Sequence, residues 1–288
     1  MSAVSKSKSQ STWEHIDRGI VRTKTYEDGR EKVTSYSIGK ILGSSLSFKV
    51  IGLNPKKEGK SLAIKVIKTS PSSRSPFHQR EGLSREYQIL LLVEEKCPSF
   101  KGYFKGFIPQ SKTHEPTLII RKMNSTWEDR EPDNIITRIF ALRDLANQLK
   151  ELHSNGISHM DTRDHNIMYH KVKEKYFIID FGSSLTKSLL ERFEYDAATL
   201  ARIRDLNMEL DDYDLEAYPT TSVRPSLGHS FEDHCKRDIL ELIQSTKPHV
   251  DPLLSPNPKI MTLWDIEHAP NTIDEFLEKI QEVIDYIG

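Results

Sequence analysis

The sequence predicts an α+β fold in which a small β-rich half precedes a larger helical half. Between Tyr36 and Lys68 three strand-like segments follow one another, and turn-forming residues separate the last two. From Ile135 onward the apolar residues recur at helical spacing, and this pattern stops at Asn155-Gly156. We therefore expect a three-stranded sheet in the first half and mostly helices in the second.

The first eighteen residues are expected to form a flexible tail, because their Ser/Lys-rich beginning has almost nothing to bury. From Gly19 the pattern becomes strand-like, and Asp28-Gly29 stands between two polar, β-branched arms, as in a tight hairpin. Residues 19–124 are therefore predicted to be the β-rich unit, with this hairpin added ahead of its core strands.

The remaining elements follow from periodicity. A Ser/Pro-rich linker precedes a predicted helix over residues 81–95, and the apolar segment 117–123 is predicted to be a strand. Residues 125–288 are predicted to be the helical unit. Its last segment, 271–288, has the one-sided apolar pattern of a helix that closes a core.

Composition excludes several classes of protein. Lys+Arg 41 and Asp+Glu 42 nearly cancel, which gives no support to nucleic-acid binding. Two cysteines are too few for a disulfide framework and fit a reducing compartment. No apolar run approaches the roughly 18 residues of a membrane span, and no secretory signal opens the chain. We expect an intracellular, cytoplasmic protein, or an effector delivered into a host cytoplasm, and the oligomeric state stays open.

The strongest chemical signal lies between residues 153 and 184. Asp161 is followed five positions later by Asn166, and a second aspartate, Asp180, opens an Asp-Phe-Gly sequence. Two short apolar strands join these groups. Phosphoryl transfer needs an acceptor for the proton of the incoming hydroxyl and oxygen ligands for Mg²⁺, and these side chains can supply both.

This stretch resembles the catalytic and metal loops of the protein kinases, H-R-D-x-x-x-x-N followed by D-F-G. The resemblance implies a two-lobed protein-kinase-like fold with a nucleotide cleft between the lobes. It implies transfer of the γ-phosphoryl group of ATP, held with Mg²⁺, to a hydroxyl of a protein substrate, Ser/Thr by default. Asp161 would be the catalytic base, Arg163 would replace the usual catalytic-loop Lys, and Asn166 and Asp180 would bind Mg²⁺.

The resemblance extends upstream to about residue 36. The segment Leu-Ala-Ile-Lys is similar to the family's V-A-I-K, which makes Lys65 the residue expected to grip the α- and β-phosphates. Glu86 is its implied carboxylate partner, with Glu81 as the alternative. After the next strand, Ile120 would be the gatekeeper of the adenine pocket, and Met123 would offer backbone hydrogen bonds to the base.

The chain departs from the family in its phosphate-covering loop. Gly43 and Val50 match the Gly-rich pattern, but Ser45 and Phe48 stand where its second and third glycines belong. Met160 replaces the Arg of H-R-D, which argues against control by activation-loop phosphorylation. Two alternatives are therefore kept: a pseudokinase that only binds partners, and a small-molecule phosphotransferase with the H-x-D-x-x-x-x-N arrangement.

Two segments compete to anchor the catalytic loop. In the first interpretation Asp196 is the anchor, on a helix over residues 193–210 that directly follows the metal loop. In the second, Asp238 is the anchor, on a helix over residues 235–245, and residues 220–230 form a divergent docking segment. The helical periodicity next to the metal loop favours the first interpretation.

Overall fold

The computed structural model describes residues 10–45, 47–56, 61–68, 76–190, 230–248 and 257–288. The chain divides into two compact units. Unit 1 comprises Met1–Leu91 and Gly102–Lys122, and unit 2 comprises Leu92–Lys101 and Met123–Gly288.

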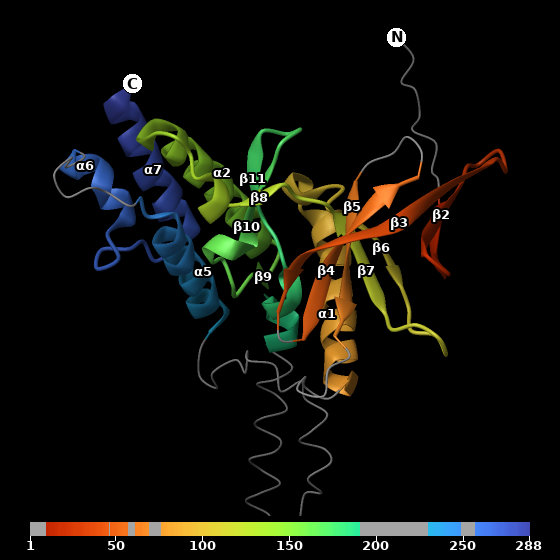
Figure 1. Cartoon of the computed structure of the whole chain (residues 1–288). Coiled ribbons are helices and arrows are strands. Elements are labelled where there is room, and N and C mark those ends of the chain that lie inside the picture. Colours follow the sequence, from red (N-terminus) through yellow and green to blue (C-terminus); the bar gives the residue numbers. More distant parts are fainter. Residues whose placement is uncertain (1–9, 46, 57–60, 69–75, 191–229, 249–256) are drawn as a thin grey trace, which may run out of the picture. The chain divides into compact units, whose positions relative to one another are not determined.

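A seven-stranded antiparallel sheet forms unit 1, with the strand order β1-β2-β3-β4-β5-β7-β6 (Figure 1). Its strands are β1 (Gln10–Ile16), β2 (Gly19–Thr25), β3 (Glu31–Ser44), β4 (Phe48–Pro55), β5 (Leu62–Ile67), β6 (Phe104–Ile108) and β7 (Thr117–Arg121). Helix α1 (Pro76–Lys96) follows β5. The core of the unit joins side chains from most of these strands, including Trp13, Ile20 and Leu53.

The two edge strands of this sheet, β1 and β6, contact each other and nearly close it. Trp13 of β1 is buried, and its indole Nε1 donates a hydrogen bond to the carbonyl oxygen of Lys105 at 3.1 Å. Gly106 leaves room for the indole, because a Cβ there would lie 2.3 Å from Trp13 Nε1. The indole of Trp13 thus joins the two edges of the sheet.

This arrangement corrects the predicted fold class. A two-lobed protein-kinase-like fold with a small N-terminal lobe was expected, whereas the first half holds a nearly closed, barrel-like antiparallel sheet and most helices come later. The predicted class is wrong because the sequence interpretation undercounted the strands. Strand β6 was not predicted, and residues 10–16, assigned to a flexible tail, form β1.

Other predicted elements of unit 1 are present in the structure. The β2–β3 hairpin turns at Asp28-Gly29, where Gly29 has a φ of 77° and its N–H donates to the carbonyl oxygen of Tyr26. The turn needs glycine because side chains are disfavoured in this left-handed region. The three expected core strands are β3, β4 and β5.

Unit 2 is mainly helical (Figure 1). Its helices α2 (Ile135–Ser154), α5 (Phe231–Thr246) and α7 (Ile273–Ile287) contact one another. The short helix α6 (Pro258–Met261) lies between α5 and α7 along the chain. A capping box formed by Asn134 and Thr137 starts α2. The small strands are β8 (Ser125–Thr126), β9 (Ile157–Ser158), β10 (Ile167–His170), β11 (Lys175–Ile178) and β12 (Leu185–Thr186), and the 3₁₀ turns are η1 (Pro98–Phe100), η2 (Glu128–Arg130), η3 (Asp164–Asn166), η4 (Phe181–Ser183) and η5 (Thr262–Trp264).

The substitution Gly106→Ala should weaken the closure of the sheet. The new methyl group would displace the buried indole of Trp13 from its hydrogen bond to Lys105. We expect the free energy of unfolding, measured by urea denaturation, to fall by about 1–3 kcal/mol, the usual cost of overpacking. Gly43→Ala is the matched control, because a Cβ there meets no atom of the described residues within 4 Å. Equal losses in both variants would contradict this account.

A pair of stacked histidines should make the closure sensitive to pH. His15 of β1 stacks on His114 with ring centroids 4.4 Å apart, and its Nε2 lies 3.1 Å from the hydroxyl of Thr117. Burial, and then the charge of His114, lower the pKa of His15 below its ordinary 6.5. The folded state therefore favours the neutral ring, so stability is retained above the unfolded pKa and declines as the pH falls through it.

We expect the free energy of unfolding to fall more steeply between about pH 7 and pH 5 in the native protein than in His15→Gln. Urea titrations at several pH values measure this difference. Identical pH profiles for the two proteins would show that the stacked pair does not couple protonation to folding.

Candidate active site

A buried carboxylate on α5 holds the predicted catalytic loop in place. The side chain of Asp238 accepts hydrogen bonds from the backbone N–H groups of His159 at 2.8 Å and Met160 at 2.6 Å. It also accepts the hydroxyl of Ser158 at 2.9 Å, and Nε2 of His153 lies 3.0 Å away. Met160 has a φ of 65°, and these bonds hold its backbone in that left-handed conformation.

The anchor is therefore Asp238, the second of the two interpretations, and the favoured assignment to Asp196 is wrong. Asp196 and its expected helix lie outside the described residues. Burial alone would raise the pKa of Asp238, but the hydrogen bond and charge of His153 and the N–H of His159 outweigh it. The pKa of Asp238 is held below its ordinary 3.8, so the carboxylate is charged at neutral pH.

The loop held by Asp238 positions Asp161. The neighbouring Thr162 is fixed to α5, because its hydroxyl donates to the carbonyl oxygen of Asp238 at 2.8 Å and its N–H donates to Glu241 at 3.1 Å. Asp161 itself accepts a hydrogen bond from the guanidinium of Arg163. The side chain of Arg163 is 58% exposed, so its charge is available at the surface beside the carboxylate. The structure thus brings two predicted catalytic residues together.

The two predicted Mg²⁺ ligands lie at the same end of one hairpin. Strands β10 and β11 are antiparallel, with Ile167 opposite Ile178. Asn166 directly precedes the first of these strands and Asp180 follows the second, and the N–H of Ile179 donates to the carbonyl oxygen of Asn166 at 2.8 Å. The register of this hairpin therefore sets where both side chains begin.

The orientation of these ligands is also fixed locally. The amide Nδ2 of Asn166 donates to the carbonyl oxygen of Asp161 at 3.1 Å, which links the asparagine to the predicted catalytic loop. Asp180 has a φ of 63°, and its Oδ1 accepts the N–H of Gly182 at 3.1 Å. An amide oxygen and a carboxylate are the ligands that Mg²⁺ takes when substrate phosphates complete its shell. The chemistry of this donor pair fits Mg²⁺.

Aromatic rings pack behind the Asp-Phe-Gly turn. The ring of Phe181 meets that of His159 edge-on at a centroid distance of 5.0 Å and that of Phe100 at 5.5 Å. His159 Nε2 lies 3.0 Å from the carbonyl oxygen of Ile179, and the hydroxyl of Ser184 donates to the carbonyl oxygen of His159. Burial lowers the pKa of His159, which keeps its ring neutral in this packing. The predicted catalytic loop and the Asp180 turn are thus joined through His159.

Unit 1 contains the predicted ion pair. Nζ of Lys65 lies 2.8 Å from Oε2 of Glu86, and both side chains are buried. Glu86, rather than the alternative Glu81, is the carboxylate that this contact joins to the lysine. On the sheet, Lys65 stands opposite Val50, and Val50 stands opposite Gly43. Backbone register therefore places these three predicted nucleotide-binding residues in one row across β3, β4 and β5.

The two predicted adenine-site residues are both buried. Ile120 lies on β7, where it pairs with Ala63 of β5. Met123 begins the second segment of unit 2, and the N–H of the following residue, Asn124, donates to the carbonyl oxygen of Tyr169. Contact of Ile120 and Met123 with a nucleotide base stays a prediction.

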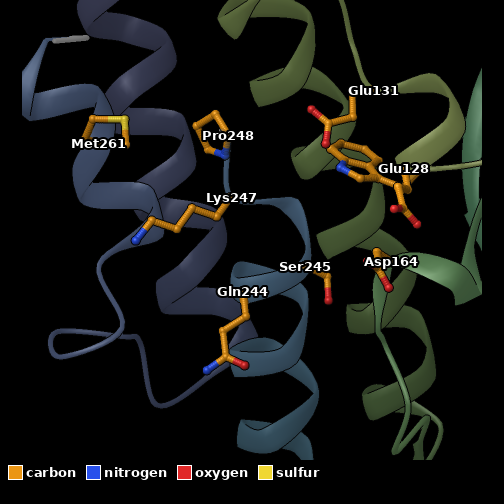
Figure 2. Close-up of a pocket in the computed structure, with 9 residues that line it drawn as sticks. Glu128, Glu131, Asp164, Gln244, Ser245, Lys247, Pro248 and Met261 are labelled. Atoms are coloured by element: carbon orange, nitrogen blue, oxygen red, sulfur yellow. The ribbon is translucent and has the colours of Figure 1, made fainter. Parts of the chain in front are cut away.

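A separate pocket of about 550 Å³ lies in unit 2 (Figure 2). The carboxylate residues Glu128, Glu131 and Asp164 lie on one side in this view, and Lys247 lies on the other. Glu131 accepts a hydrogen bond from Arg138, so part of this negative charge is neutralised. The residues that line the pocket are Trp127, Glu128, Glu131, Asp164, Gln244, Ser245, Lys247, Pro248 and Met261. None of the predicted site residues is among them.

Sequence reasoning missed several residues that support the site. His153, Thr162 and Glu241 connect the loop to α2 and α5, although nothing in their spacing singles them out. Phe48 was noted as a departure from the glycine pattern that could pack under the loop, but its contact with Lys65, whose Nζ lies 5.0 Å from the centroid of its ring, was not predicted. The replacement of a glycine by an aromatic residue was the signal that could have indicated this contact.

Comparison with known proteins gives distant similarities, among them two proteins of Dictyostelium discoideum. No known protein-family profile matches the chain. The chain is 28% identical over 171 residues to a probable LIM domain-containing serine/threonine-protein kinase of Dictyostelium discoideum, covering 57% of this chain and 25% of that protein. It is 28% identical over 149 residues to a second protein of the same description and organism, covering 49% of this chain and 15% of that protein. The chain thus spans a quarter or less of these relatives, and the similarity suggests a relationship to kinases.

Among the helices of the described ranges, none has the length and apolar character that crossing a bilayer requires.

Removing the charge of the anchor should loosen the loop. In Asp238→Asn the amide keeps one acceptor oxygen and presents its NH₂ group to a backbone N–H, which leaves a buried donor unsatisfied. We expect the free energy of unfolding to fall by about 1–3 kcal/mol for each unsatisfied donor. Hydrogen exchange should rise at the amides of His159 and Met160. Asp274→Asn, at an exposed ion pair with Lys150, is the matched control and should cost little. Unchanged exchange at the two amides would contradict the anchoring role.

Proposed function

We propose that this protein transfers the γ-phosphoryl group of ATP, with Mg²⁺, to a hydroxyl of a protein substrate, Ser/Thr by default. One observation carries the proposal: the β10–β11 hairpin and the loop held by Asp238 bring Asp161, Asn166 and Asp180 into one connected cluster. Because the fold class is not the predicted one, the argument rests on the chemistry of these residues and not on fold analogy.

Each side chain has a defined part in this reaction. Asp161 orients the incoming hydroxyl and accepts its proton, while Arg163 beside it stabilises negative charge on the transferred group. Asn166 and Asp180 would hold Mg²⁺, which would neutralise negative charge on the phosphates. Lys65, positioned by Glu86, contacts the α- and β-phosphates. Catalysis then depends on positioning and charge neutralisation.

The proposed phosphoryl transfer forms one bond and breaks one. A bond forms between the substrate hydroxyl oxygen and the γ-phosphorus, and the bond from that phosphorus to the bridging β–γ oxygen breaks. The electron pair of the broken bond leaves with ADP, and the hydroxyl proton passes to Asp161. The names of the two Dictyostelium relatives support the same reaction class, at low identity and over part of their length.

The second candidate is a pseudokinase that binds partners without turnover. The observation in its favour is the loop between β3 and β4, where the N–H of Phe48 donates to the hydroxyl of Ser45 and is engaged within the protein. Glycines at these positions would let backbone N–H groups approach a phosphate. The presence of both proposed Mg²⁺ ligands favours the active enzyme over this candidate.

The test combines nucleotide binding with turnover. The native protein should show a thermal shift with ATP that depends on Mg²⁺, and it should transfer labelled phosphate to protein. Asp161→Asn should reduce turnover by about 10²–10⁴-fold, the usual contribution of a general base, while its melting temperature stays close to native. Asp180→Asn should abolish the Mg²⁺ dependence of the thermal shift.

Asp144→Asn is the control and should remain active, because Asp144 lies on α2 in a partly exposed ion pair with Lys175 of β11. Phosphorylation by Asp161→Asn at the native rate would contradict the assigned roles. Label that ends in a soluble compound would instead indicate a small-molecule phosphotransferase, and a native protein without any transfer would support the pseudokinase.

A further inference from the structure

Hydrogen bonds fix the described residues between β3 and β4, Ser45 and Ser47, and the first residue of β4, Phe48. The N–H of Ser45 donates to the carbonyl oxygen of Phe48 at 2.9 Å, and the N–H of Phe48 donates to the hydroxyl of Ser45 at 3.1 Å. Lys68, just after β5, adds two contacts: its N–H donates to the carbonyl oxygen of Ser47 at 2.9 Å, and its Nζ donates to that of Ser45. These bonds fix the position at which Phe48 enters β4.

Strand register directs the ring of Phe48 toward Lys65. Val50 of β4 stands opposite Lys65 of β5, so their side chains lie on the same face of the sheet. Phe48 lies two residues before Val50 and shares that face, since side chains alternate along a strand. The ring is a diagonal neighbour of the lysine, and Nζ of Lys65 lies over it at 5.0 Å from the centroid.

Helix α1 also contacts the ring of Phe48, which packs against Lys65 of the sheet. A Cβ built on Gly82 would lie 3.8 Å from Cζ of Phe48, so the tip of the ring reaches the helix surface. Glu86 follows Gly82 by one helical turn and faces the same way, which is why it can reach Lys65 at 2.8 Å. The lysine ammonium therefore has the Glu86 carboxylate and the Phe48 ring as neighbours within unit 1.

We propose that Phe48 is a gate for phosphate. Its ring packs against the Lys65 ammonium and must move before the phosphates of a nucleotide can bind there. This inference rests on the proposed function, because it concerns the access of phosphate to Lys65. In the closed arrangement the ring attracts the cation, and the N–H of Phe48 is engaged by Ser45. Opening the gate moves the ring off the lysine and releases that N–H.

The gate has a measurable consequence for affinity. When only a fraction of molecules is competent to bind, the apparent dissociation constant is the intrinsic value divided by that fraction. A variant without the ring should therefore bind phosphate-bearing ligands more tightly than the native protein. A ligand that does not reach Lys65 should bind both proteins equally.

The experiment measures the binding of MgATP and of adenosine to the full chain by calorimetry. We expect Phe48→Gly to lower the dissociation constant of MgATP by about three- to thirtyfold and to leave that of adenosine within about twofold. Phe48→Leu, which keeps apolar bulk but lacks the aromatic face, should fall between them. Phe107→Leu is the matched control, because Phe107 also packs an aromatic ring onto α1, through its stack with Tyr87 at 4.4 Å.

The outcomes distinguish a failure of the proposed gate from a failure of the proposed function. Tighter MgATP binding in Phe48→Gly, with adenosine and Phe107→Leu unchanged, supports the gate. If the native protein binds MgATP and a folded Phe48→Gly binds it no more tightly, the gate is overturned while the proposed function stands. If neither folded protein binds MgATP, the proposed function fails and the gate fails with it.

Discussion

The buried carboxylate of Asp238 is the interaction on which the candidate site of unit 2 depends. A charge in the protein interior is tolerated only when hydrogen bonds replace its lost hydration, and here the loop of residues 158–160 supplies them. The same bonds satisfy backbone donors that would otherwise be buried without partners. Because the charge and the loop stabilise each other, the backbone on either side of Asp161 has one defined conformation.

Local contacts position the rest of the candidate site relative to the loop that Asp238 holds. The amide of Asn166 donates back to Asp161, and the β10–β11 register then fixes where Asp180 begins. Unit 1 holds a second buried charged pair, Lys65 and Glu86, which carries its own desolvation cost. Buried charges that stability alone does not require are candidates for function. Both units therefore contain the type of group that phosphoryl transfer uses.

The fold class and the sequence motifs of this chain do not agree with each other. The nearly closed seven-stranded sheet does not match the fold class that the motifs implied, whereas some side chains named by those motifs contact each other within each unit, as Lys65 and Glu86 do in unit 1 and Asp161 and Arg163 do in unit 2. Chemistry belongs to a site and not to a fold as a whole. Phe48 shows the same principle at one position, since a residue that departs from the family pattern contacts the lysine that the pattern predicts.

The sequence by itself determined the elements and contacts whose signals are local. Strands β10 and β11 and helices α2 and α7 follow from apolar runs and periodicity, whereas the choice of Glu86 as the partner of Lys65 came from the resemblance to the protein-kinase pattern. Only the tertiary structure identified β1 and β6 as strands, because one buried Trp13 in a polar segment is a weak local signal. It alone selected Asp238, because both candidate segments have helical periodicity and the bonds that decide between them join residues about eighty positions apart.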